Sequence, residues 1–102
     1  MILEHKDKEY ELKYTYNSFR YMQELDLGEL ETIERKPFKI LGLTEELLFG
    51  AANNDPKRKV SITKVQEIVE TRMENGELVE LMERLIELLE ESSFFKNLQT
   101  VE

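Results

Sequence analysis

Hydrophobic and polar residues alternate in EYELKYTY, near the start of the chain. A period of two with β-favouring aromatic residues predicts a half-buried strand. MILE, on the other side of HKDK, is expected to pair with it as an antiparallel strand, although no Asn-Gly or Asp-Gly turn separates the two. The residues that share one side of the longer strand are Tyr10, Leu12, Tyr14 and Tyr16.

After this hairpin the hydrophobic period becomes helical. Asn17 or Ser18 can cap a first helix, because a short polar side chain at this position accepts from the free backbone N–H groups. Asp26 and Gly28 are expected to end it. The inner residues of this helix would be Phe19, Met22 and Leu25.

A second helix is expected in EELLFGAANN. Thr44 is a suitable cap for it, and Glu45 and Glu46 would lie in its first turn, where the helix dipole favours negative charge. Pro37 can open a helical turn, because proline is tolerated at the first helical position. The pattern over 31–43 predicts no further element.

Two more helices are clear in the second half of the chain. The first would begin at a capping Ser61 and end at Asn75-Gly76, because glycine supplies the left-handed residue that ends many helices. ELVELMERLIELLEESS follows at once, and two helices with so short a connection fold back as an antiparallel pair. The apolar face of the first of them comprises Ile62, Val65, Val69 and Met73.

These patterns predict a mainly α fold, in which a small helical domain has a short N-terminal β-hairpin and a C-terminal antiparallel helix pair. A chain of 102 residues fits one domain with one core. Its predicted parts are a hairpin over 1–16, helices over 17–54, a loop over 55–60, and a helical hairpin over 61–75 and 77–98.

The charge balance argues against two classes of partner. The chain has 22 acidic and 14 basic residues, which gives a formal net charge of −8. Nucleic-acid surfaces need clustered lysine and arginine, and helices that bind anionic membranes carry a basic face, so neither nucleic acid nor membrane is expected as a partner. The chain has no cysteine. It also lacks a signal-peptide core and any apolar run near the roughly 18 residues of a membrane span, so a cytosolic setting is expected.

No residue pattern predicts catalysis, a cofactor or a metal site. His5 is the single histidine, and it is expected to be a solvated turn residue. The glutamates of the last helix are expected on its solvent-exposed side. No Glu-x-x-His pair is present to hold a metal. Lys57, Arg58 and Lys59 are expected to be a solubilising loop cluster. The chain is therefore not expected to be an enzyme.

The last helix and the residues after it carry the candidate binding surface. With Leu78 at 0° on a projection of about 100° per residue, one apolar stripe extends from about −20° to about 100° and faces the core. A helix that continued past Ser92-Ser93 would aim another apolar set between about 160° and 280°, across the acidic side. The core stripe comprises Leu78, Val79, Met82, Leu85, Ile86 and Leu89; the candidate protein-binding residues are Leu88, Phe94, Phe95 and Leu98.

Two interpretations of this tail stay open. In the first, Ser92-Ser93 breaks the helix, and the phenylalanines fold back over the domain's own core. In the second, they form an apolar patch for a partner, because exposed clusters of aromatic residues mark interaction sites.

The pattern SITKVQEIVETRMENGELVELMERLIELLEESSFF resembles the C-terminal half of the tail assembly chaperones of long-tailed (siphovirus-type) phages and prophages. The shared features are a capped helix, a break at glycine, a Leu/Glu-rich helix and a closing Ser-Phe-Phe. YELKYTY and LTEELLFGAANND are similar to the N-terminal part of that family. The resemblance covers most of the chain but not 31–43.

This resemblance implies a protein without catalysis that binds the tape measure protein in the host bacterial cytoplasm. It would keep that protein soluble during tail assembly and be absent from the mature virion. The tail tube protein and other copies of the chain are further candidate partners. The alternative is a helical adaptor or inhibitor of one protein, antitoxin-like or anti-factor. A coiled-coil-rich reading frame directly downstream would favour the chaperone, and a toxin or sigma-factor gene the alternative.

Overall fold

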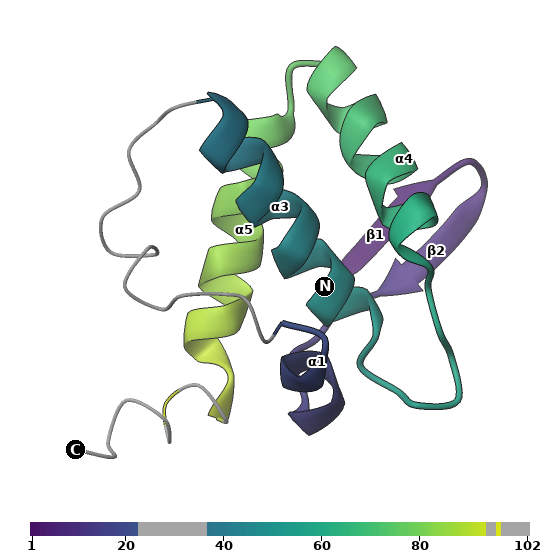
Figure 1. The fold of residues 1–102 in the computed structure, drawn as a ribbon, viewed down its shortest axis with the longest axis vertical. Helices are drawn as coiled ribbons and strands as arrows, with labels where there is room; N and C mark the ends of the chain where they lie inside the picture. The colour runs from purple at the N-terminus through teal and green to yellow at the C-terminus, as the bar shows by residue number, and fades with distance from the viewer. Residues whose placement is uncertain (23–36, 94–95, 97–102) are drawn as a thin grey trace.

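The computed structural model describes residues 1–22, 37–93 and 96. Within them, a two-stranded antiparallel hairpin precedes a set of helices, which confirms the mainly α fold with an N-terminal hairpin (Figure 1). The strands are β1 (Ile2–His5) and β2 (Lys8–Glu11); the helices are α1 (Tyr16–Arg20), α3 (Pro37–Ala52), α4 (Ile62–Glu74) and α5 (Leu78–Glu91).

The hairpin turns on Lys6 and Asp7, which connect the paired residues His5 and Lys8. Both turn residues have positive φ, 47° and 62°. A type I′ two-residue hairpin loop needs this left-handed backbone at both positions to match the twist of the strands, and aspartate adopts it more readily than most residues. The turn therefore forms without the Asn-Gly or Asp-Gly pair that is typical of such a turn.

The predicted alternation holds in the hairpin until the chain enters α1. Tyr10, Leu12 and Tyr14 are all buried. Tyr16 was expected on the same side, but its side chain is 67% exposed. The reason is that Tyr16 is the first residue of α1, where the period of two no longer applies.

The cap of α1 is Thr15, so the predicted caps Asn17 and Ser18 are wrong. The Thr15 hydroxyl accepts from the backbone N–H of Ser18 at 3.4 Å, and the Ser18 hydroxyl accepts from the backbone N–H of Thr15 at 3.0 Å. This reciprocal pair is a capping box with serine in the third helical position. Met22 is buried as predicted, but it lies beyond α1, which ends at Arg20 and not at the predicted Asp26 and Gly28. Leu25, Asp26 and Gly28 lie outside the described residues.

Helix α3 begins at Pro37, where the sequence allows a helical turn, and runs through Thr44 to Ala52. The prediction that Thr44 caps a shorter helix is therefore wrong. Thr44 is buried, and its hydroxyl donates to the backbone oxygen of Ile40 at 2.7 Å. A threonine inside a helix can satisfy its hydroxyl on the preceding turn in this way, so its capping preference did not decide the outcome.

The core forms around α3, which contacts α1, α4 and α5. In Figure 1, α4 and α5 run in opposite directions on the two sides of α3, so the antiparallel order of the last two helices is as predicted. The fully buried residues of the core with less than 2% exposure include Leu47 and Leu48 from α3, Val65, Ile68 and Val69 from α4, and Leu85 and Leu89 from α5.

The ends of α4 agree with the sequence, but its apolar face differs in part. Ser61 caps α4 by accepting from the backbone N–H of Lys64 at 3.1 Å, and Gly76 beyond the helix has a φ of 74°. Ile62 and Met73, expected on the core face, are 44% and 46% exposed. They lie at the two ends of the helix, where no neighbouring element covers them fully.

The buried side of α5 is wider than the predicted stripe. Leu81 is buried although it falls near −60° on the same projection. Val79, at the other edge of the stripe, is 37% exposed, whereas Leu78, Met82, Leu85, Ile86 and Leu89 contact the core as predicted. Because α5 packs along α3, the buried arc is displaced toward the side that carries Leu81.

Candidate functional site

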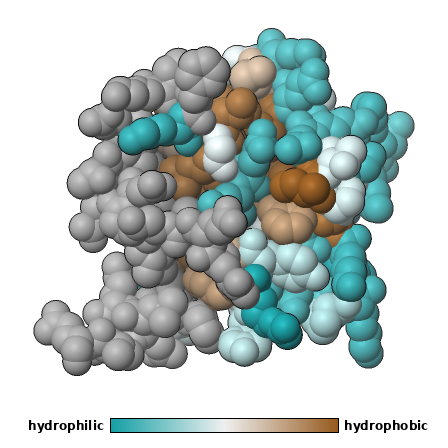
Figure 2. Space-filling view, in the orientation of Figure 1, coloured by the Kyte–Doolittle hydropathy of each residue, from teal (hydrophilic) through white to brown (hydrophobic). Residues whose placement is uncertain are grey.

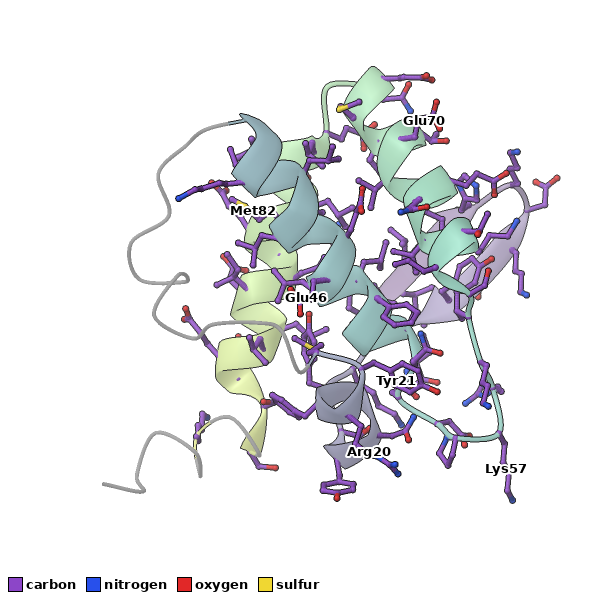
Figure 3. The ribbon with its side chains drawn as sticks, viewed as in Figure 1. Arg20, Tyr21, Glu46, Lys57, Glu70 and Met82 are labelled. Atoms are coloured by element: carbon purple, nitrogen blue, oxygen red, sulfur yellow. The ribbon has the colours of Figure 1, made fainter. Side chains whose placement is uncertain are left out.

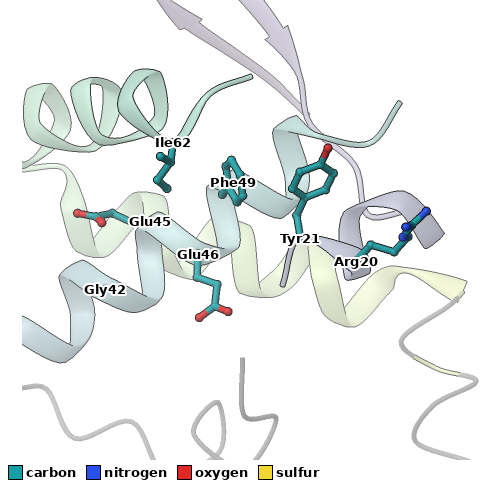
Figure 4. A pocket seen from close by; sticks show the side chains of 7 residues that line it. All are labelled: Arg20, Tyr21, Gly42, Glu45, Glu46, Phe49 and Ile62. Carbon is teal, nitrogen blue, oxygen red and sulfur yellow. The ribbon is translucent and has the colours of Figure 1, made fainter. Parts of the chain in front are cut away.

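A hollow of about 530 Å³ lies on the outer face of α3, between the end of α1 and the start of α4 (Figure 4). Four of its residues come from α3 and are spaced i, i+3, i+4 and i+7, so they share one face of that helix. The remaining walls come from α1, the residue after it, and the first residue of α4. The lining residues are Arg20, Tyr21, Gly42, Glu45, Glu46, Phe49 and Ile62.

The centre of the hollow is apolar. The rings of Tyr21 and Phe49 meet edge to face, with centroids 5.1 Å apart and planes at 88°. In Figure 4, Phe49 points from α3 toward Ile62, which points back from α4. Figure 2 shows apolar surface gathered in the middle of this face, with hydrophilic surface beside it. An exposed apolar centre of this kind is typical of a surface that binds another protein.

Ile62 is held at the edge of the hollow by the loop that precedes it. The side chain of Asn53 donates to the backbone oxygens of Phe49, at 2.8 Å, and Val60, at 3.0 Å, and accepts from the backbone N–H of Val60 at 2.8 Å. The side chain of Asn54 donates to the backbone oxygens of Glu11 and Ala51. These bonds of two buried asparagines fasten the loop to α3 and β2 and so fix the point at which α4 begins.

Gly42 leaves one end of the hollow open. A glycine inside a helix costs about 0.5–1 kcal/mol relative to alanine, so its presence there usually has a packing or functional reason. Apart from the neighbouring residues and backbone of α3 itself, no atom of the described residues lies within 4 Å of the position that a Cβ would take at Gly42. Gly50, by contrast, lies directly against the side chain of Met22. The contact with Met22 therefore explains the glycine at position 50. At position 42 the missing side chain leaves open space instead.

A second hollow, of about 440 Å³, adjoins the first and shares Arg20 and Tyr21 with it. We call the two together the α3 groove. Figure 3 shows Glu46, Tyr21 and Arg20 one after another along this face. One end of the groove is acidic, its middle is aromatic and its other end is basic. The second hollow is lined by Asn17, Arg20, Tyr21, Pro56 and Lys59.

The predicted tail surface falls largely beyond the part of the chain that can be described. Phe94, Phe95 and Leu98 lie outside the described residues. Leu88 is half-buried and packs against the core, so its side chain does not lie on the acidic side of α5. Whether these four residues bind a protein stays a prediction.

Helix α5 ends at Glu91, so the helical segment expected over 77–98 is interrupted at Ser92, as in the interpretation that breaks the helix at Ser92-Ser93. Ser92 has an extended backbone, with φ −68° and ψ 137°, and its hydroxyl donates to the backbone oxygen of Leu89 at 2.7 Å. Serine competes in this way with the helical bonding of its own turn. The helical projection placed Phe94 and Phe95 on the acidic side of a helix that continued past Ser92. Because α5 ends before Ser92, that projection does not apply to them.

His5 is a correction to the sequence-based prediction. It lies on β1, it is only 6% exposed, and its Nε2 lies 3.3 Å from Oε2 of Glu67 on α4. Lys64 and Lys6 donate to the same carboxylate at 2.8 and 3.0 Å. Bonds from Lys64, then Lys6 and His5, lower the pKa of Glu67 from 4.5 to about 2. These contacts join the hairpin to α4, so we assign them a structural role.

The other polar clusters suggest no chemistry of their own. Lys57, Arg58 and Lys59 are exposed, as expected for a loop, and Arg58 lies 3.6 Å from the carboxylate of Asp55. Among the residues that the structure describes, no three histidine, aspartate or glutamate side chains gather as a metal site. No helix in this described part is both long and apolar enough to cross a bilayer.

No protein-family model, no curated protein and no solved structure matches this chain. The α3 groove was also absent from the sequence-based prediction. Its signal was present in the sequence as Gly42, Glu45, Glu46 and Phe49, which have the spacing of one helix face. The assignment of Thr44 as a cap hid this signal, because it placed Gly42 in a loop.

Proposed function

We propose that this chain is a tail assembly chaperone of a long-tailed phage or prophage. It binds the tape measure protein, keeps that protein soluble during tail assembly and is absent from the mature virion. The observation that carries the proposal is the α3 groove, an open surface with an apolar centre and charged ends. The sequence resemblance supplies the identity of the partner.

The dimensions of the groove suit a helical partner. From Gly42 to Phe49 the α3 face spans two turns, or about 10 Å at 1.5 Å per residue, and the second hollow extends the surface further. A helix with an apolar stripe can lie along such a surface, as in other helix-in-groove complexes. The partner that the resemblance implies is a long helical chain with exposed apolar stripes, which would aggregate if left bare.

The charge of the chain suits the release of that partner as well as its protection. Copies that each carry −8 repel one another and keep a coated complex in solution. A groove about two to three turns long gives a weak contact, and many weak contacts along one polymer give avidity without permanent binding. Displacement during tail assembly therefore remains easy.

Co-expression with the large protein encoded directly downstream tests this function. We expect that protein to be soluble only when the chain is present. Ile62→Glu should abolish this effect, because it places a charge in the apolar centre of the groove. Met73→Glu is the matched control, since Met73 lies on the same helix, is about equally exposed at 46% against 44%, and does not line the groove.

Three results would contradict the proposal or the surface assigned to it. If the downstream protein is equally soluble with and without the chain, the chain is not its chaperone. A tight complex with one copy of a small toxin or sigma factor would instead establish the adaptor or inhibitor function. Equal loss of solubilisation in Ile62→Glu and Met73→Glu would show that the groove is not the binding surface.

A further inference from the structure

We propose that the α3 groove fixes the direction in which a helix binds. The basic end of the bound segment lies over Glu45, and its acidic end lies over Arg20 and Lys59. This inference rests on the proposed function and adds the chemistry of the segment: an apolar stripe with lysine or arginine at one end and glutamate or aspartate at the other.

The argument begins with the separation of charge along the groove. Glu45 and Glu46 line the hollow that Gly42 leaves open, and Lys59 lines the second hollow. Arg20 lines both hollows, and in Figure 4 its side chain extends away from Phe49 and Ile62, toward the outer end. A bound helix therefore meets opposite charges at its two ends.

The apolar centre gives this charge pattern its effect. Tyr21, Phe49 and Ile62 can bury an apolar stripe in either direction, because burial of apolar area is not directional. Charged groups next to a covered surface are screened less by water and salt than fully exposed ones. The apolar contacts thus provide the binding energy, and the charges at the two ends favour one of the two orientations of the helix along the groove.

A designed peptide can report the direction. The probe is a helical peptide of about 14 residues, or about 21 Å, with one leucine stripe, two lysines in its first turn and two glutamates in its last. A single cysteine beside the lysines carries a nitroxide label, and the chain itself has no cysteine that would take the label. The label broadens the NMR signals of the backbone amides nearest to it. We expect strong broadening at Gly42 and Glu45 and little at Lys59.

Charge exchange within the groove tests the cause. Arg20→Glu with Glu45→Lys leaves the net charge at −8, since the two changes contribute −2 and +2. Because Glu46 and Lys59 remain, each end becomes nearly neutral, and the label should broaden both ends about equally. Adding Glu46→Lys and Lys59→Glu should reverse the direction. The matched control is Lys39→Glu with Glu70→Lys, two exposed positions outside the groove, which should leave the direction unchanged.

Affinity gives a second measurement. Glu45→Gln alone should weaken binding of the peptide by about twofold to fivefold, the range expected for losing one partly exposed ion pair. Added salt should reduce this difference, because it screens the charges at the rim.

The inference is overturned if the unchanged protein shows equal broadening at both ends, if the direction persists in the charge-exchanged variants, or if the peptide does not bind. These outcomes differ from failure of the proposed function. A chain that keeps the downstream protein soluble but binds the peptide in both directions would remain a chaperone without a directional groove. A chain that fails to solubilise that protein would lose the chaperone function, whatever the peptide shows.

Discussion

Gly50 of α3 lies directly against the buried side chain of Met22, which follows α1. A Cβ at Gly50 would overlap the sulfur and Cγ of Met22 and would lie 3.3 Å from the backbone oxygen of Ser18. The missing side chain therefore lets the segment that ends in Tyr21 and Met22 come close to α3. This contact places Tyr21 beside Phe49, two turns of α3 away from Gly42.

The two glycines of α3 should respond in opposite ways to alanine. Gly42→Ala should raise the free energy of unfolding by about 0.5–1 kcal/mol, because alanine favours the helix and meets open space. Gly50→Ala should lower it by about 1 kcal/mol, because the displacement of Met22 outweighs the helical gain. Urea unfolding of both variants measures the difference. A Gly50→Ala variant as stable as Gly42→Ala would show that Met22 moves aside freely.

Gly42→Trp separates stability from binding at the same position. The Cβ of the tryptophan meets open space and its ring can occupy the hollow, so we expect the variant to stay folded. It should nevertheless fail to solubilise the downstream protein, whereas Gly42→Ala should retain that activity. The far-UV circular dichroism and unfolding midpoint of the two variants provide the control. Retained activity in the tryptophan variant would argue against binding along this face.

The carboxylate of Glu67 should contribute stability that depends on pH. Its pKa is about 2 in the folded chain, below its usual 4.5, so its contribution is present above about pH 4.5 and is lost as the pH falls toward 2. Glu67→Gln should therefore lose less stability than the unchanged chain across this interval. Urea unfolding from pH 5 to pH 2 measures the two slopes, with the exposed Glu70→Gln as control. Parallel slopes for Glu67→Gln and the unchanged chain would contradict the assignment.

The buried hydroxyl of Tyr14 gives a test of the junction between the hairpin and α3. It donates to the backbone oxygen of Leu47 at 2.9 Å, and burial raises the pKa of Tyr14 far above its usual value. Tyr14→Phe should cost about 1–2 kcal/mol, because it leaves that buried oxygen without the bond. In an alkaline titration followed by phenolate absorbance, Tyr14 should ionise only as the chain unfolds. Ionisation of all four tyrosines before unfolding would contradict this.

Local patterns in the sequence predict much of this fold. Contacts between distant segments explain the predictions that were wrong. Ser61 and Gly76 bound α4 as predicted because caps act on their own turn. His5 was misplaced because its partner, Glu67, is 62 residues away. Thr44 was misread because its local capping preference and its place within the longer α3 compete, and packing decided between them. The α3 face of the groove could have been found from the spacing of Gly42, Glu45, Glu46 and Phe49, but its walls from α1 and α4 depend on contacts between distant segments.

The tail residues Phe94, Phe95 and Leu98 provide the last prediction, because the two interpretations of the tail differ in what they predict for stability. If these residues form a second binding surface, their joint replacement by glutamate should abolish partner binding and barely change the unfolding midpoint. If they cover the core, the same change should cost several kcal/mol, as truncation of buried aromatics does. Thermal unfolding and the co-expression assay measure the two effects.

A control with the same added charge is available in the same segment: Asn97, Gln99 and Thr100 replaced together by glutamate. It should leave both stability and binding unchanged under the second-surface interpretation. Comparison with Ile62→Glu then identifies the main binding surface. If the tail variant binds normally while Ile62→Glu does not, the partner lies on the α3 groove alone, and the tail phenylalanines have no part in the contact.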